Sequence, residues 1–207
     1  YRDSIGNSPS LADVIKMVHP SATSPEKDAL FGLLTESKKL TDAKRKKLPS
    51  VVKAMEAFKS GDGPMPEKAP MQMLTAFAKT TEDWRGILDR ASWTETRMNL
   101  KAFQRHDVFA ASRAITVAAD RLRDPALVRR SKVFPYQLLA AYINVDHATV
   151  PAEVIEALQD AMEIAVDNVP VLGLDNIILA PDVSGSMSSP VTGHTAVPSK
   201  ILCTHVA

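Results

Sequence analysis

Three oxygen-bearing side chains near the carboxyl end of the chain have the types and the spacing of metal ligands. Asp182, Ser184 and Ser186 follow an apolar run at alternate positions, and a glycine stands between the two serines. One carboxylate and two hydroxyls can curl around a single hard cation, and Mg²⁺ prefers such oxygen ligands together with several waters. We therefore predict a site for Mg²⁺ or another divalent cation here, against the alternative of a serine-rich turn after an edge strand.

The same residues do not indicate hydrolase chemistry. Ser184 and Ser186 lie outside a Gly-x-Ser-x-Gly pattern, which marks the nucleophile of many hydrolases. None of the five histidines has the spacing of a metal ligand, and none stands where it could serve as a general base beside the cation. Hydrolase chemistry is therefore not indicated, and a metal-dependent hydrolase ranks last among the functions considered.

The positive and negative charges are distributed unevenly along the chain. The net charge is +1, but residues 1–132 contain 24 Lys and Arg against 16 Asp and Glu, whereas residues 133–207 contain one and eight. Phosphate backbones attract basic surfaces through charge and counterion release, so the basic region favours a nucleic-acid ligand. The alternatives are solvated surfaces, or charges that neutralise each other across a domain contact. Two basic clusters stand out: Lys38, Lys39, Lys44, Arg45, Lys46 and Lys47, and then Arg121, Arg123, Arg129, Arg130 and Lys132.

The elements that carry these residues are predicted to be helical as far as residue 170. Ser10 and Ser92 begin Ser-x-x-acid capping boxes, and Ser24 precedes a proline at the first position of a predicted helix. Pro151 begins a further predicted helix with one apolar face. A similar apolar stripe follows Ser10. The pattern predicts about nine helical segments of roughly 9–20 residues, arranged as stacked pairs in a solenoid. Residues 173–180 form the only clear strand.

Composition limits the class of protein further. With 45% hydrophobic and 24% charged residues the chain is typical of a soluble globular protein, and no apolar stretch approaches the ~20 residues of a membrane span. A single cysteine, Cys203, excludes an internal disulfide and suits a reducing cytoplasm. Aromatic residues make up only 5% of the chain, so base stacking along a long groove is not indicated. We expect the following side chains to pack in the core: Trp84, Trp93, Met65, Met71, Met73 and Met98.

Several stretches, taken in order, resemble the landmarks of one family. Residues 182–187, Asp-Val-Ser-Gly-Ser-Met, resemble the metal-ion-dependent adhesion site (MIDAS) of von Willebrand factor A (vWA) domains. Residues 13–20 resemble a helix that ends in an Arg-Leu-Ser-His-like motif, and residues 84–100 resemble a Trp…Leu-Arg-Asn-Leu segment. Residues 133–140 resemble a His-Pro-Phe-His-Ile-Leu-type motif. A basic, all-helical region joined to the start of a vWA domain is the layout of TROVE proteins, the family of the Ro autoantigen and its bacterial relatives.

The resemblance implies a mostly α fold: a HEAT-like helical repeat solenoid, part of a ring, followed by the first strand and metal loop of an α/β vWA domain. Residues 1–170 would be the TROVE-type repeats, and residues 171–207 the start of the vWA domain. The family binds small noncoding Y-like RNAs on an outer basic surface and the 3′ ends of misfolded RNAs through a central hole, in RNA quality control. Its members are not enzymes, so the resemblance implies that this protein is not an enzyme. Lys16 and His19 match RNA-binding positions of the family, and Arg2 does so once a gap is introduced.

The resemblance also implies partners and departures. The expected partners are noncoding RNA and an exoribonuclease or another protein, in the cytoplasm, with neither membrane nor DNA involved. The family's first repeats would precede Tyr1, and the residues that complete the metal site would follow Ala207, so we expect a fragment with an incomplete site. The alternative function is a protein-interaction adaptor, built from helical repeats and a divalent-metal vWA site, without an RNA ligand.

Overall fold

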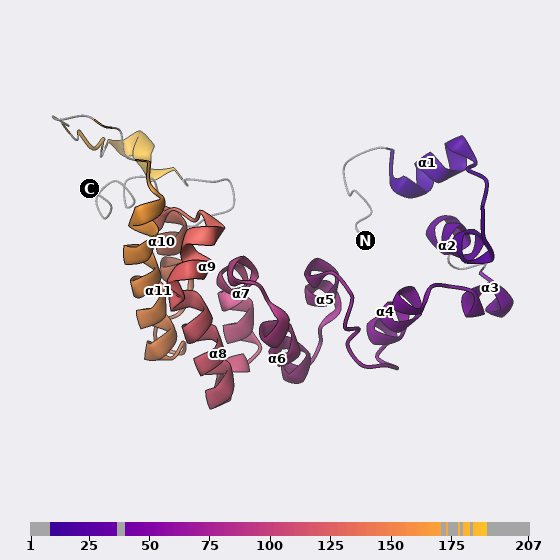
Figure 1. The fold of residues 1–207 in the computed structure, drawn as a ribbon, viewed down its shortest axis with the longest axis horizontal. Coiled ribbons are helices and arrows are strands. Elements are labelled where there is room, and N and C mark those ends of the chain that lie inside the picture. Colours follow the sequence, from indigo (N-terminus) through magenta and orange to yellow (C-terminus); the bar gives the residue numbers. More distant parts are fainter. Residues whose placement is uncertain are drawn as a thin grey trace. The chain divides into compact units, whose positions relative to one another are not determined.

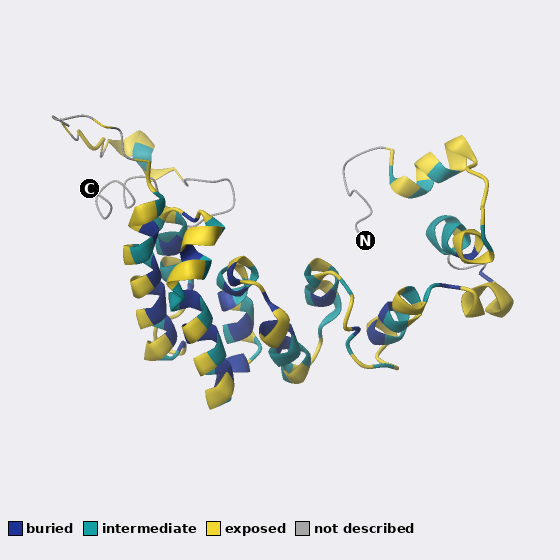
Figure 2. Ribbon diagram, viewed as in Figure 1, coloured by how far each residue is buried: buried dark blue, intermediate teal, exposed yellow. Residues whose placement is uncertain are grey.

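The chain is helical wherever the structure describes regular elements. The computed structural model describes residues 9–36, 40–170, 173, 178, 180–182 and 184–189, and helices and 3₁₀ turns are the regular structure in these ranges. The chain divides into two compact units, Tyr1–Ala78 and Lys79–Ala207. Figure 1 labels the helices in chain order, and Figure 2 shows the burial of each. The prediction of a mostly helical protein is therefore confirmed for the described residues.

Two of the five described helices of the first unit, those that follow Ser10 and Ser24, begin where the sequence predicts. They are α1 (Leu11–Val18), α2 (Pro25–Glu36), α3 (Asp42–Lys46), α4 (Ser50–Ser60) and α5 (Met71–Phe77). The Ser10 hydroxyl accepts a hydrogen bond from the Asp13 N–H at 3.2 Å, and the Asp13 carboxylate accepts one from the Ser10 N–H at 3.1 Å. This is the predicted capping box of α1. The helix α4 ends at Gly61, whose φ of 94° is costly for any residue with a side chain.

The core of the first unit is small and centres on α2 and the two ends of α3. One cluster consists of Ala29, Leu40 and Leu48, with Leu33 and Val52 packed against them, and α4 and α5 also bury Met55, Phe58 and Leu74. Among the described residues α1 buries none of its side chains, and Leu11, Met17 and Val18 are 60%, 63% and 67% exposed. The apolar stripe that the sequence predicts on α1 therefore faces solvent in the described part of this unit.

The second unit has longer helices and a larger core. Its elements are α6 (Thr81–Arg90), α7 (Trp93–Arg105), α8 (Ser112–Arg123), α9 (Pro125–Ser131), α10 (Pro135–Asn144) and α11 (Ala152–Ala165), with 3₁₀ turns η2 (Val108–Ala110), η3 (Val166–Asn168) and η4 (Gly185–Ser188). The helix α11 packs against α8, α9 and α10, and Figure 2 shows buried positions along α8 and α11. Phe103, Leu122, Leu138 and Leu158 are among the largest fully buried side chains.

Both tryptophans belong to this core, as the sequence predicts. Trp93 Nε1 donates to the Leu122 carbonyl at 3.0 Å, and Trp84 packs edge-on against Phe103 with ring centroids 6.1 Å apart. The prediction was wrong for Met98, which is 69% exposed on α7. The buried residues of α7 fall on one stripe of the helix, and residue 98 lies on the opposite side of that stripe because an α-helix has 3.6 residues per turn.

The described helices are more numerous and shorter than predicted. There are eleven α-helices of 5 to 14 residues in the described ranges, against about nine segments expected. Prolines shorten them, since Pro125 and Pro135 each occupy the first position of a new helix. The predicted strand at residues 173–180 lies largely outside the described residues, and the predicted boundary after residue 170 stays a prediction. No described helix combines the length and the apolar character needed to cross a membrane.

Candidate nucleic-acid interface

The predicted metal loop is exposed and is organised by its own hydrogen bonds. The Ser184 N–H donates to Asp182 Oδ1 at 2.8 Å, and the hydroxyl oxygens of Ser184 and Ser186 lie 3.0 Å apart. Hydrogen bonds from the backbone and side chain of Ser184 lower the pKa of the Asp182 carboxyl, which favours its charged form. These three oxygen donors fit part of the shell of Mg²⁺. No group of three His, Cys, Asp or Glu placed to hold a metal occurs among the described residues, so a site here would depend on hydroxyls and water.

The predicted RNA contacts of the first unit lie at the end of α1. Lys16 occupies the last turn, and His19 caps the helix with a left-handed φ of 48°. The His19 N–H donates to the Ile15 carbonyl at 3.0 Å, and both the Lys16 and His19 side chains are exposed. The fold thus brings Lys16 and His19 to one end of one helix, whereas Arg2 lies outside the described residues.

The first basic cluster is partly engaged in the fold of its own unit. Lys44 Nζ lies 2.9 Å from Asp28 Oδ2, and this ion pair joins α3 to α2. Lys46 and Lys47 are exposed at the carboxyl end of α3, where positive charge interacts favourably with the helix dipole. Lys38 and Lys39 lie outside the described residues. Within the described part of this cluster, the end of α3 therefore presents the exposed charge.

Arg121 of the second cluster has a structural role. Its Nη1 donates to the Leu88 carbonyl at 2.6 Å and to the Thr96 hydroxyl at 3.0 Å, and its Nη2 donates to the Asp89 carbonyl at 3.3 Å. These bonds join α8 to the end of α6 and to α7. Burial lowers the pKa of the Arg121 guanidinium while Asp89 opposes that shift, and arginine in proteins stays charged at neutral pH.

Arg123 and Arg129 connect the basic part of the sequence to the acidic part. Arg123 Nη2 donates to the Glu153 carbonyl at 3.2 Å, which ties α8 to α11. Arg129 Nη2 lies 3.0 Å from Asp167 Oδ2, which ties α9 to η3. These contacts lie within one compact unit, so they do not test the alternative that the charges neutralise each other across a domain contact. The two arginines contribute less free positive charge to a ligand than their number in the sequence indicates.

A surface hollow of about 390 Å³ in the second unit contains Arg130 together with hydroxyl-bearing residues. It is lined by the start of α7, by α8 and by the end of α9: Ala91, Ser92, Trp93, Thr94, Arg121, Leu127, Arg130 and Ser131. The side chains of Arg130 and of Lys132 make no hydrogen bond or ion pair with another described residue. Guanidinium and hydroxyl groups are the donors with which proteins contact phosphate.

Sequence reasoning missed a cationic and aromatic group at the start of α10. Arg97 of α7 donates through Nη1 to the Gln137 carbonyl at 3.0 Å, and its Nε is buried without a partner among the described residues. Burial lowers the pKa of the Arg97 guanidinium. The side chains of Phe134 and Tyr136 are both exposed, and their rings are nearly parallel. Both residues lie at the start of α10, next in sequence to Gln137, whose carbonyl Arg97 contacts. In the sequence, the only sign of this group was the pair of aromatic residues on either side of Pro135. The position of Arg97 at the start of α10 could not be predicted, because it depends on the packing of α7 against α10.

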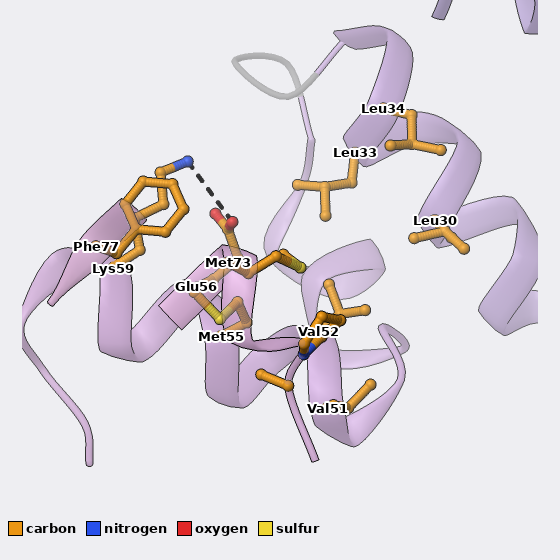
Figure 3. A pocket seen from close by; sticks show the side chains of 12 residues that line it. Leu30, Leu33, Leu34, Val51, Val52, Met55, Glu56, Lys59, Met73 and Phe77 are labelled. Atoms are coloured by element: carbon orange, nitrogen blue, oxygen red, sulfur yellow. Dashed lines mark ion pairs between the residues drawn. The ribbon is translucent and has the colours of Figure 1, made fainter. Parts of the chain in front are cut away.

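The first unit contains an apolar hollow of about 460 Å³ between α2, α4 and α5 (Figure 3). Leucines, valines and methionines line most of it, and Phe77 and Pro70 lie at the α5 side. Lys59 Nζ lies 3.7 Å from Glu56 Oε1 and 5.4 Å from the centre of the Phe77 ring. The hollow thus combines apolar walls with one ion pair, a composition typical of peptide or small-molecule sites.

These features define a helical protein with two exposed basic regions and an apolar hollow. No model of a known protein family matches the chain. The chain is similar to the RNA-binding protein RO60 of Deinococcus radiodurans, with 26% identity over 196 residues that cover 86% of this chain and 36% of the relative. The chain thus spans little more than a third of that protein's length. The similarity supports the resemblance to the Ro family that the sequence motifs indicate, and it leaves the vWA assignment a prediction.

Proposed function

We propose that the protein is an RNA-binding scaffold of the Ro type. The observation that carries this proposal is the similarity, over most of the chain, to a protein named for RNA binding. The exposed side chains of Arg130 and Lys132 make no bond with another described residue, and Arg130 lines a hollow that also contains hydroxyl groups. These charges support the proposal because RNA affinity arises largely from phosphate contacts. In the finer form of the proposal, the ligands are small noncoding Y-like RNAs and the 3′ ends of misfolded RNAs, and the role is RNA quality control in the cytoplasm.

The two units would contribute different contacts. Lys16 and His19, exposed at the end of α1, would meet the phosphates of a structured RNA, and Arg130 and Lys132 would meet phosphates at the second unit. Arg121, Arg123 and Arg129 would keep the helices in place beneath the ligand. In this proposal the protein binds RNA without catalysing a reaction, and an exoribonuclease or another protein partner would act on the bound RNA.

RNA binding is tested by filter-binding titration with a structured small RNA that carries a single-stranded 3′ tail. We expect the affinity to fall roughly tenfold or more over a few-fold rise in salt, because several phosphates are neutralised. Replacing Lys16 and His19 together by Ala should weaken binding while the circular dichroism spectrum stays the same. Unchanged affinity in that variant would remove Lys16 and His19 from the interface, and binding no tighter than to a neutral control protein would refute the proposal.

We propose further that Asp182, Ser184 and Ser186 hold Mg²⁺ or another divalent cation. When bound, the ion would supply a positive coordination site for a carboxylate of a partner or for the fold itself. In the complete protein, we expect MgCl₂ to raise the melting temperature of the wild type but not that of Asp182→Ala. The matched control Asp62→Ala, which removes an exposed carboxylate from a loop of the first unit, should keep the shift. Equal shifts in Asp182→Ala and wild type would place the ion elsewhere.

A protein-interaction adaptor is the second candidate function. The apolar hollow between α2, α4 and α5 favours it, since such walls suit an apolar side chain of a peptide (Figure 3). Binding through apolar burial responds much less to salt than binding to phosphates does. The salt dependence of ligand affinity therefore separates the two functions.

A further inference from the structure

Two aromatic rings at the start of α10 remain in solvent although the core of their unit lies close by. Phe134 is 37% exposed and Tyr136 is 39% exposed, whereas Val133 and Leu138, on either side of them in the sequence, are buried. The two rings are nearly parallel, with an interplanar angle of 14° and centroids 6.2 Å apart. Exposed aromatic faces are costly in water, and a pair of them held parallel suits a flat ligand.

The surroundings of the two rings are positively charged. Arg97 Nη1 donates to the carbonyl of Gln137, so its guanidinium lies against the first turn of α10. Lys132 is exposed two positions before Phe134 and makes no side-chain bond with another described residue. The sequence contains no Asp or Glu between Asp124 and Asp146. An anionic ligand would therefore meet cations beside the aromatic rings.

The position of the two rings outside both described hollows favours an RNA base over a protein side chain as the ligand. Neither ring lines the apolar hollow of the first unit or the hollow beside Arg130. A protein anchor of high affinity fills a concave pocket, whereas an unpaired base needs only an aromatic face to stack on and a cation near its phosphate. Exposed parallel rings, together with a lysine that makes no bond with another described residue, thus match a nucleotide of single-stranded RNA.

We propose that Phe134 and Tyr136 form a stacking site for an unpaired base of single-stranded RNA, with Lys132 and Arg97 close to the adjoining phosphates. The inference deepens the proposed RNA-binding function and rests on it. It adds a contact to the base itself, which tolerates any sequence because every base presents a π-face. A short stacking site of this kind does not require the many aromatic residues of a long base-stacking groove.

The test compares a single-stranded RNA with the same strand carrying abasic positions. Wild-type protein should bind the base-containing strand about fivefold or more tightly than the abasic strand, since stacking on an aromatic ring strengthens binding by that order for each base. The double variant Phe134→Leu, Tyr136→Leu keeps apolar side chains but has no rings, so this ratio should fall to about one while affinity for the abasic strand stays unchanged. The control Tyr136→Phe keeps both rings and should keep the ratio.

The outcomes separate this inference from the proposed function. An unchanged ratio in the double variant, with salt-sensitive binding retained, would overturn the stacking site and leave RNA binding in place. An equal loss of affinity for both strands, with an altered melting temperature, would also overturn it, because the rings would then only support the fold. Failure of the wild type to bind either strand would refute the RNA-binding function, and the stacking site with it.

Discussion

At the scale of single residues, the basic side chains differ in what surrounds them. Arg121 donates to two carbonyls and a buried threonine hydroxyl, whereas Arg130, which lines the same hollow, makes no such bond with the described residues. The sequence presents both as members of one cluster. Their roles diverge because Arg121 lies on the face of α8 that meets α6 and α7, while Arg130 is exposed near the end of α9.

Replacing Arg121 by Ala should destabilise the second unit by about 1–3 kcal/mol, because the carbonyls and the Thr96 hydroxyl lose their donor in a partly buried place. The free energy of unfolding, measured with urea, reports this change. Arg130→Ala is the matched control and should stay within about 0.5 kcal/mol of wild type, as surface substitutions do. A cost for Arg130→Ala equal to that for Arg121→Ala would contradict the distinction between a structural and a ligand-facing arginine.

At the scale of elements, capping residues set the starts of several helices. In α6 the Thr80 hydroxyl accepts the Asp83 N–H at 3.1 Å, and Asp83 Oδ2 accepts the Thr80 N–H at 2.9 Å and the Lys79 N–H at 3.0 Å. These bonds satisfy amides that the helix itself leaves without partners. The last turn of α6 contains the carbonyls that accept hydrogen bonds from Arg121. The position of α6 therefore affects the position of Arg121, which lines the hollow of the second unit.

Thr80→Ala should lower the free energy of unfolding by about 1 kcal/mol, since a capping hydroxyl is lost. Thr116→Ala is a control of the same chemistry at an exposed position inside α8, where alanine is the better helix former. The two substitutions should therefore change the stability in opposite directions in urea unfolding. A stability unchanged by Thr80→Ala would show that tertiary packing alone fixes the start of α6.

Helix starts could be predicted from the sequence, whereas burial could be predicted only in part. Ser10, Ser24 and Ser92 act as caps as expected, because capping depends on residues within one turn. The apolar stripe of α1 and Met98 are exposed against expectation, because burial depends on which other element covers a face. The candidate interface has the same limit. Basic residues were visible in the sequence, but α7, α8 and α9 had to be placed before the hollow could be seen.

At the scale of the whole molecule, the uneven charge of the chain has two consequences. Part of the positive charge is used within the second unit, where Arg123 and Arg129 meet α11 and η3 from the acidic part of the sequence. Within the second basic cluster, Arg130 and Lys132 stay exposed without a bond to another described residue, and the proposed RNA ligand would contact them there. Net charge alone therefore understates the capacity of the protein to bind a polyanion.

The most direct test of RNA binding is the salt dependence of affinity for a tailed structured RNA, compared between two charge-matched double variants. Arg130→Ala with Lys132→Ala removes two cations that have no ion pair within the described part of the chain. Arg113→Ala with Arg129→Ala removes two cations that pair with Asp89 and Asp167. We predict that the first variant lowers the magnitude of the slope of log affinity against log salt by about 1–2, and that the second lowers it by less than half as much. Equal slopes for the wild type and the first variant, or no salt-sensitive binding by the wild type, would contradict an RNA interface at this surface.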